Sequence, residues 1–209
     1  METKACSSLL LLLLLLTTLI LSSAVPTTRD IHIVRRDLMA SLNDLCKKTT
    51  NPNLCVQTIQ PHFHGSADPF QALSAEVDAT LDEAKKTLAD IKTLLTKPDN
   101  GKSLKDSLKV CQDQYSSMLD SIADTKASIG KKDVITAKFK FSAVISFQSA
   151  CKDSFGGQKI PFLKDSDEVY QLGGNCLDII ADIEKALPAK PAPVQQAPSA
   201  FSNVVGTVS

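Results

Sequence analysis

The cysteines are the residues whose type and spacing could do chemistry, and that chemistry is disulfide formation. Cys46 and Cys55 enclose a short turn that contains an Asn-Pro-Asn sequence. Cys111 and Cys151 lie on two separate helical patterns, and each is 20 residues from Lys131, which sits at the turn between them. Two antiparallel helices that meet at Lys131 would bring both sulfur atoms to the same height. The spacing therefore predicts two bridges, Cys46–Cys55 and Cys111–Cys151.

Residues 1–24 are typical of a secretory signal peptide. Lys4 supplies a basic start, a leucine run follows, and Ala24 ends a stretch of small residues suited to a signal peptidase. The alternative is a membrane anchor, but the apolar core of about 13 residues is shorter than the ~20 that a spanning helix needs. We expect cleavage after Ala24, secretion to the extracellular space, and no membrane contact after cleavage.

One free thiol is expected in the mature protein. Cys6 leaves with the signal peptide, so five cysteines remain, an odd number in an oxidising compartment. Cys176 lies between Leu172 and Ile179 on an apolar helical seam, which predicts a buried, small apolar side chain. The alternative roles, an intermolecular disulfide or a redox switch, would need an exposure that these neighbours disfavour.

Charge and aromatic content exclude several classes of function. The chain has 23 basic and 23 acidic residues, and the signal peptide contains one of each, so the mature protein is also neutral. No net charge attracts it to nucleic acid or to an anionic membrane. The chain has no Trp and two Tyr, which gives direct carbohydrate binding little support.

The other polar groups do not form a recognisable active site. His62 and His64 could suggest a metal, but no Cys or carboxylate set completes a zinc site, so a polar loop is the simpler interpretation. The acidic pairs Asp82-Glu83 and Asp167-Glu168 are expected on solvated faces or at helix starts. The Gly173-Gly174 pair lacks the context of a phosphate loop and is interpreted as a flexible point. Neither G-x-S-x-G nor H-E-x-x-H occurs, so we expect no metal, no cofactor and no enzyme activity.

Four helical patterns must position the cysteines. Apolar residues alternate at spacings of four and three within residues 77–95, 104–129, 133–155 and 169–187. Gly130 is expected to end the second pattern, and Asp133 is expected to be the N-cap of the third. The predicted fold class is all-α, an up-down-up-down four-helix bundle. A coiled-coil dimer is the rival, which the tight turns between the helices disfavour.

A shorter helical pattern at residues 31–45 precedes the Cys46–Cys55 turn and predicts an N-terminal helical hairpin. The expected boundaries are a signal peptide at 1–24, the hairpin at 25–66, the bundle at 67–188 and a tail at 189–209. Residues 25–188 would form one domain. The tail contains prolines among Ala, Gln and Ser without periodicity, which predicts disorder.

Several segments resemble the plant invertase and pectin methylesterase inhibitor family. Leu45–Cys55 resembles the N-terminal signature of the family, and Cys111–Tyr115 resembles its C-x-x-x-Y motif. Phe141–Val144 and Cys151–Phe155 together resemble the family's S-A-A-x…C-x-D-x-F segment. Asn175–Ile179 resembles part of the family's last helix. The resemblance extends from about Leu38 to Leu187. It departs at Ser149-Ala150, where the family often has a small residue and threonine. The family fold is the same bundle and hairpin with the same two disulfides, and many members also have an unpaired cysteine in the last helix.

The resemblance implies a proteinaceous inhibitor that forms a one-to-one complex with a plant enzyme and covers its active-site cleft. It also implies that the secreted protein reaches the apoplast, with the vacuole as a second possible destination. Inhibitors of acid invertase in this family can carry Pro-Lys-Phe after an aspartate at the start of the third bundle helix. Here Asp133 is followed by Val134-Ile135-Thr136, and Lys138-Phe139 lies one turn later without a proline. Pectin methylesterase is therefore the favoured target and acid invertase (β-fructofuranosidase) the alternative. A non-inhibitory structural or signalling bundle of the cell wall is the second alternative.

The resemblance also implies a contact surface, because the later helices of the bundle pack around the target's cleft. The candidate interface residues are the outward polar positions of the second and third bundle helices: Gln112, Asp113, Ser116, Ser117, Asp120, Lys138, Lys140, Ser142 and Ser146. The simpler interpretation of each is an ordinary solvated position. Because a plant cell wall is acidic, carboxylate contacts would make binding depend on pH.

Overall fold

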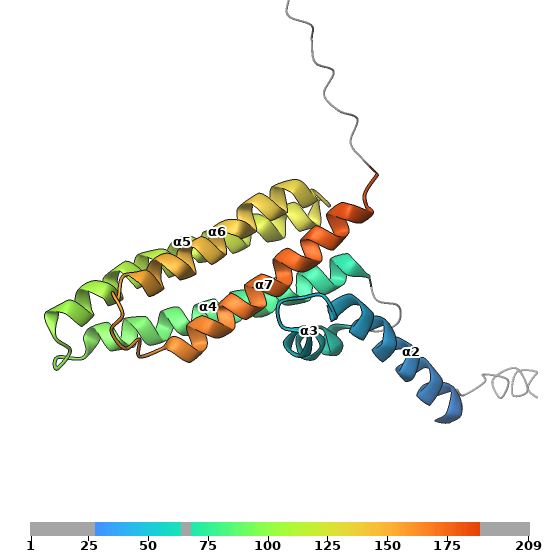
Figure 1. The fold of residues 1–209 in the computed structure, drawn as a ribbon, viewed down its shortest axis with the longest axis horizontal. Coiled ribbons are helices and arrows are strands. Elements are labelled where there is room, and N and C mark those ends of the chain that lie inside the picture. Colours follow the sequence, from blue (N-terminus) through green and yellow to red (C-terminus); the bar gives the residue numbers. More distant parts are fainter. Residues whose placement is uncertain (1–27, 64–67, 189–209) are drawn as a thin grey trace, which may run out of the picture.

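The computed structural model describes residues 28–63 and 68–188, with side chains from residue 36 onward (Figure 1). Helices are the only regular secondary structure among the described residues, and turns and loops connect them. Its elements are α2 (Thr28–Cys46), α3 (Pro52–Ile59), the 3₁₀ helix η1 (Gln60–His62), α4 (Pro69–Thr96), α5 (Lys102–Gly130), α6 (Val134–Asp153) and α7 (Leu163–Ala186). The predicted signal peptide and C-terminal tail lie outside the described residues. No helix within the described ranges has the length and apolar character needed to cross a bilayer.

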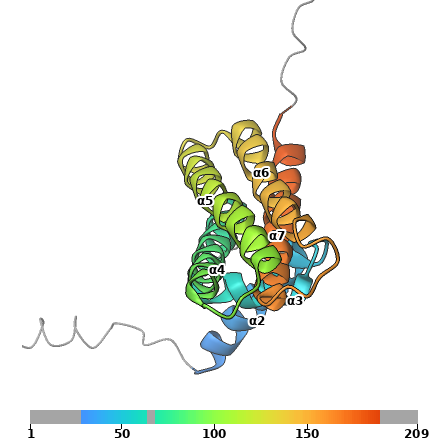
Figure 2. The ribbon, with the colours of Figure 1, turned by 90° about the vertical axis from the view of Figure 1, so that its left-hand side faces the viewer.

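Helices α4 to α7 form the predicted four-helix bundle, seen along its length in Figure 1 and nearly end-on in Figure 2. Each helix packs against two neighbours, α5 against α4 and α6, and α7 against α4 and α6. The core contains the side chains at the four-and-three spacings, among them Leu108, Met118, Ile122, Phe141 and Val144, all fully buried. Each such side chain contributes roughly 1.5–3 kcal/mol through burial, which makes this seam the main source of stability.

The turn between α5 and α6 differs in detail from the expectation. Gly130 is the last residue of α5, as predicted, but it remains helical, and the left-handed residue is Lys132 with a φ of 56°. The Nζ atom of Lys132 lies 5.5 Å from the centroid of the Phe70 ring, a cation–π contact with the start of α4. Asp133 is the N-cap of α6, as predicted, and accepts a hydrogen bond from the Thr136 amide at 3.1 Å.

The N-terminal hairpin, formed by α2 and α3, packs against one end of the bundle (Figure 1). The Cys46–Cys55 disulfide closes the turn between its helices. Leu42 and Ile59 are fully buried and belong to the same hydrophobic cluster as the bundle core. The hairpin and the bundle therefore share one core.

The interpretation of Gly173-Gly174 as a flexible point was wrong. Both residues lie inside α7, where they allow two other segments to approach closely. A Cβ atom at Gly173 would lie 2.6 Å from Cδ1 of Ile145 on α6, and one at Gly174 would lie 2.5 Å from Oγ1 of Thr50 in the hairpin turn. The missing side chains are therefore a packing requirement.

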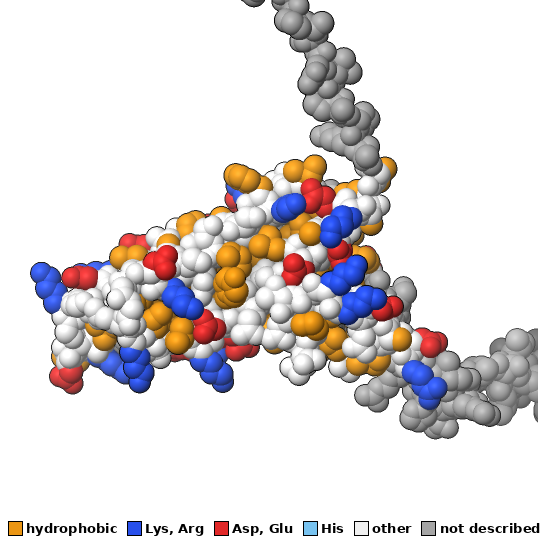
Figure 3. All heavy atoms as spheres, viewed as in Figure 1, with side chains coloured by type: hydrophobic (Ala, Val, Ile, Leu, Met, Phe, Trp, Pro, Cys, Tyr) orange, Lys and Arg blue, Asp and Glu red, His pale blue; other side chains and the backbone are white. Residues whose placement is uncertain are grey.

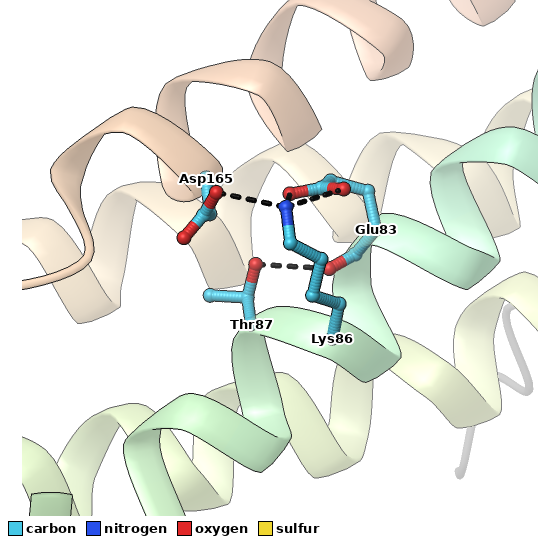
Figure 4. Close-up of polar contacts among 4 residues, drawn as sticks. All are labelled: Glu83, Lys86, Thr87 and Asp165. Atoms are coloured by element: carbon cyan, nitrogen blue, oxygen red, sulfur yellow. Dashed lines mark hydrogen bonds and ion pairs between the residues drawn. The ribbon is translucent and has the colours of Figure 1, made fainter.

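The acidic pair at Asp82-Glu83 is also not wholly solvated. The Glu83 side chain is 12% exposed, and both its oxygens accept hydrogen bonds from Lys86 at 2.9 and 3.3 Å (Figure 4). Lys86 also binds Asp165 at the start of α7, at 2.9 Å. Burial raises the pKa of Glu83, and its hydrogen bond to Lys86 opposes that rise. This three-residue cluster joins α4 to α7.

Candidate partner-binding surface

Helices α5 and α6 are linked near both ends, which holds their outer faces in register. The Cys111–Cys151 disulfide joins them with a Cα–Cα distance of 4.5 Å. Beside it, the Ser107 hydroxyl donates to the Ser154 carbonyl oxygen at 2.8 Å. At the opposite end, the short turn before Asp133 connects the two helices directly. A pair of helices held in this way loses little conformational entropy when it binds a partner.

The α5 part of the predicted interface is mostly exposed. Asp113, Ser116, Ser117 and Asp120 are exposed, whereas Gln112 is half-buried. The Ser116 hydroxyl donates to the Gln112 carbonyl oxygen at 2.8 Å, so this hydroxyl is already satisfied within the helix. The α5 side therefore presents two carboxylates and short polar side chains.

The two predicted lysines of α6 are engaged within the molecule. Lys138 pairs with Glu184 of α7 at 2.6 Å, and Lys140, which is half-buried, pairs with Asp124 of α5 at 2.8 Å. The two pairs lie on opposite sides of α6 and connect it to different neighbours. Exposed pairs of this kind contribute at most about 1 kcal/mol, so either lysine could exchange its partner for a group on a bound protein.

Two apolar residues that the sequence analysis did not select lie on the outer face of α6. Ile135 and Phe139 are 58% and 77% exposed. Ile135, Phe139, Ser142 and Ser146 follow one another at intervals of four, three and four residues, which places all four on one line along the helix. We call these four residues the α6 stripe. Positions 135 and 139 fall opposite the core seam in the sequence, so helical periodicity indicates their exposure although both residues are apolar.

The α6 stripe has charged neighbours of both signs, because Lys138 and Lys140 flank Phe139 and pair with Glu184 and Asp124. The space-filling view in Figure 3 shows exposed hydrophobic side chains separated by charged and neutral polar ones. Single exposed apolar residues are common on protein surfaces. Ile135 and Phe139 lie four residues apart on a helix that a disulfide joins to α5, so they add exposed apolar surface on the same side of the helix as Ser142 and Ser146.

The remaining candidate chemical groups do not converge on a site. His62 is exposed in η1, and His64 lies outside the described residues. No group of three or more potential ligands in the described ranges could hold a metal ion. Cys176 is a free thiol and fully buried, with its Sγ atom 3.6 Å from the Thr80 hydroxyl. Burial, followed by the charge of Glu76, raises the pKa of this thiol well above its usual value, which makes it unreactive.

The fold is a four-helix bundle with an N-terminal helical hairpin and two disulfides. The family model for the plant invertase/pectin methylesterase inhibitor matches residues 40–179. The chain therefore belongs to this family, as the sequence motifs suggested.

Individual relatives agree with this assignment. A protein named pectinesterase inhibitor from Actinidia deliciosa is 28% identical over 117 residues, which cover 56% of this chain and 63% of that protein. This chain thus matches just under two thirds of that relative's length. The crystal structure of the mutant form A of a pectin methylesterase inhibitor from Arabidopsis has a TM-score of 0.60 and 21% identity, and the match covers 68% of this chain and 95% of that one. A pectin methylesterase inhibitor from Arabidopsis thaliana has a TM-score of 0.54 and 20% identity, with 72% and 98% covered. At these identities the two structures establish the fold.

Proposed function

We propose that this protein is a secreted inhibitor that binds pectin methylesterase in a one-to-one complex and covers its active-site cleft. Family membership supports an inhibitory role, and the relative named pectinesterase inhibitor supports this target. The protein acts in the apoplast, without a cofactor and without catalysis of its own. The α6 stripe and the exposed polar residues of α5 form the contact surface.

The observation that carries the choice of target is the start of α6. Val134 is buried, so the first turn presents Ile135 and the half-buried Thr136 in place of the basic Pro-Lys-Phe sequence. The nearest lysine along the helix, Lys138, is paired with Glu184. The first turn of α6 therefore contains no lysine at the position that the invertase-inhibitor motif would give it.

Binding would block the cleft by covering it. A stable interface of this type buries about 1,600 Å² and depends on a few dominant side chains. Phe139 is suited to be one of them, because it is a large and exposed aromatic residue on a rigid helix. The polar residues of α5 and α6 would surround this anchor and exclude water.

Titration of the mature protein, beginning at Val25, into both enzymes tests the proposal. We expect loss of ester hydrolysis by pectin methylesterase at one inhibitor per enzyme, with sucrose hydrolysis by acid invertase unchanged. Loss of sucrose hydrolysis alone would establish the alternative target. If neither activity changes, the protein is a structural or signalling bundle of the cell wall.

Replacement of Val134-Ile135-Thr136 by Pro-Lys-Phe tests whether this turn selects the target. Proline is tolerated at the first position of a helix, so α6 should still form. We expect the variant to gain inhibition of acid invertase, because its first turn now presents a cation. If invertase activity is the same with the variant and the parent, the turn does not select the target.

A further inference from the structure

Glu76 is a buried acid on α4 that the proposed inhibitory surface does not use. Its side chain is fully buried. One carboxyl oxygen, Oε1, accepts a hydrogen bond from Nδ2 of Asn175 on α7 at 3.3 Å. The other, Oε2, has no hydrogen-bond partner among the described residues. An ionised carboxylate in this position would lack most of the donors that it needs.

Asn175 connects this acid to the N-terminal hairpin. Its Oδ1 atom accepts a hydrogen bond from the backbone amide of Asn51 at 2.7 Å, and its Nδ2 atom donates to the Asn51 carbonyl oxygen at 3.3 Å. Asn51 is the N-cap of α3 and accepts a hydrogen bond from the Leu54 amide at 3.1 Å. Glu76, Asn175 and Asn51 thus form one chain of contacts from the bundle core to the first turn of α3.

Further contacts on either side of Asn175 hold the same turn of the hairpin to α7. The amide and the hydroxyl of Thr50 both donate to Oδ2 of Asp178, at 2.7 and 2.8 Å. The side-chain amide of Asn51 donates to Oε1 of Gln171. Thr50 also occupies the space left by the missing side chain of Gly174. In addition to its part in the shared core, the hairpin is therefore held to α7 by a group of polar contacts at one turn.

The protonation state of Glu76 decides whether this junction is electrostatically satisfied. Burial raises the pKa of Glu76 to about 8, and the hydrogen bond from Asn175 opposes that rise. When Glu76 loses its proton, its carboxylate can gain donors only from water, because Asn175 already shares its amide with Asn51. Water can enter where the hairpin turn moves away from α7.

The neighbouring elements provide no compensating cation among the described side chains that face this acid. On α7, the nearby titratable group is the Cys176 thiol, which would repel the carboxylate if it ionised. The α7 carboxylate of Asp178 binds Thr50, and α3 contains no charged residue. On α4 itself, Asp78 pairs with Lys126 of α5 at 2.5 Å.

We propose that protonation of Glu76 couples the surrounding pH to the docking of the N-terminal hairpin on α7. At low pH, protonated Glu76 allows the hairpin to dock stably on the bundle. Loss of the proton makes this docking less stable. The stability of this docking would follow the pH of the compartment that contains the protein. It does not depend on which enzyme the protein inhibits.

The direction of the effect follows from the two protonation equilibria. The pKa of Glu76 rises from its ordinary value of 4.5 to about 8 in the docked state. The docking stabilisation is therefore complete below about pH 4.5, is lost progressively up to about pH 8, and changes little above it.

Hydrogen exchange of the Thr50 and Asn51 amides tests the proposal, because both amides donate across the junction. Exchange rates of the mature protein are measured from pH 5 to pH 8 and divided by the intrinsic rates at each pH. We expect the protection of both amides to fall at least about tenfold over this range. At each pH the Ile122 amide in the bundle core should remain more strongly protected than these two amides, which distinguishes local opening of the hairpin from global unfolding.

The variant Glu76→Gln removes the titration while keeping the shape of the side chain. We expect its Thr50 and Asn51 protection to change less than about threefold between pH 5 and pH 8. A matched control, Asp99→Asn at an exposed position, should behave like the parent protein. Constant protection in the parent protein would overturn the proposal without any variant, and so would an equal fall in the parent protein and in Glu76→Gln.

Discussion

Phe139 is 77% exposed on a helix whose opposite face contains the buried Phe141 and Val144. Glu76 has the opposite environment, since its carboxyl group is enclosed at the junction of α4, α7 and the hairpin. At the scale of single residues, both side chains carry a solvation cost in the free protein. Binding of a partner would relieve that cost for Phe139, and protonation relieves it for Glu76.

Phe139→Ala is expected to weaken inhibition of pectin methylesterase about tenfold or more. The reason is the loss of an aromatic anchor, for which truncation commonly costs 2 kcal/mol or more. The melting temperature should not change, because the side chain contributes little to the core. The measurement is the inhibition constant, with Val110→Ala on α5 as the control for an exposed apolar residue. A change of less than about twofold would remove Phe139 from the proposed contact surface.

At the scale of the elements, α7 holds the molecule together. It packs against α4, α6 and both helices of the hairpin. Gly173 and Gly174 make this possible, because successive positions face Ile145 of α6 and Thr50 of the hairpin. The disulfide between α5 and α6 plays the corresponding role on the other side of the bundle.

Gly174→Ala is expected to lower the free energy of unfolding by roughly 1–3 kcal/mol, because the added methyl group would overlap Thr50. Gly130→Ala is the matched control. That glycine is also helical, but an added Cβ meets nothing within 4 Å, so the free energy of unfolding should rise by up to about 1 kcal/mol. Urea titrations measure both changes. An unchanged stability of Gly174→Ala would mean that the hairpin can shift without cost.

Replacement of Cys111 and Cys151 by serine is expected to cost about 4 kcal/mol, because the bridge closes a loop of 40 residues in the unfolded chain. The same replacement of Cys46 and Cys55, which are nine residues apart, should cost about 2.5 kcal/mol. Both are large against the 5–15 kcal/mol that stabilises a typical domain. Urea unfolding of the two double variants gives the comparison, and the reverse order of costs would contradict this entropic account.

At the scale of the whole molecule, the hairpin and the bundle share a hydrophobic core but meet through a polar junction. The apolar part of the junction is insensitive to pH, whereas the part that contains Glu76 is not. Two further groups act in the same direction. Burial raises the pKa of Glu83, so this group also favours the folded state under more acidic conditions. Burial raises the pKa of the Cys176 thiol too, but that effect on stability lies above its ordinary pKa of 9.

The urea midpoint of unfolding is therefore expected to be higher at pH 5 than at pH 8. Glu76 binds a proton in the folded state over this range, whereas its ordinary pKa of 4.5 leaves it mostly ionised when unfolded. Glu76→Gln should reduce the dependence on pH without abolishing it, since the raised pKa of Glu83 still contributes in the same direction. A midpoint that rises with pH in the parent protein would show that other groups dominate.

Local sequence patterns were sufficient to predict the helices and the two disulfides. The four-and-three spacing identified the buried seams because it repeats with the period of the helix itself. The equal distances of Cys111 and Cys151 from Lys131 identified their pairing, since two antiparallel helices must rise equally from a common turn. The N-cap at Asp133 was recognisable because capping depends on the next few residues alone.

Local sequence patterns did not predict which segments of the chain pack against each helix. Thr50 and Asp178 are 128 residues apart, and Glu76 and Asn175 are 99 apart. Glu76 resembles any helical glutamate in the sequence, and the Gly173-Gly174 pair resembles a flexible point. Periodicity tells which side of a helix is apolar, but it does not tell which segment packs against each side. The sequence by itself therefore determined the helices, their buried seams and the disulfides. The tertiary structure decided which acid is enclosed, which glycines are packing sites and which aromatic residue faces the solvent, because burial depends on atoms that distant parts of the chain supply.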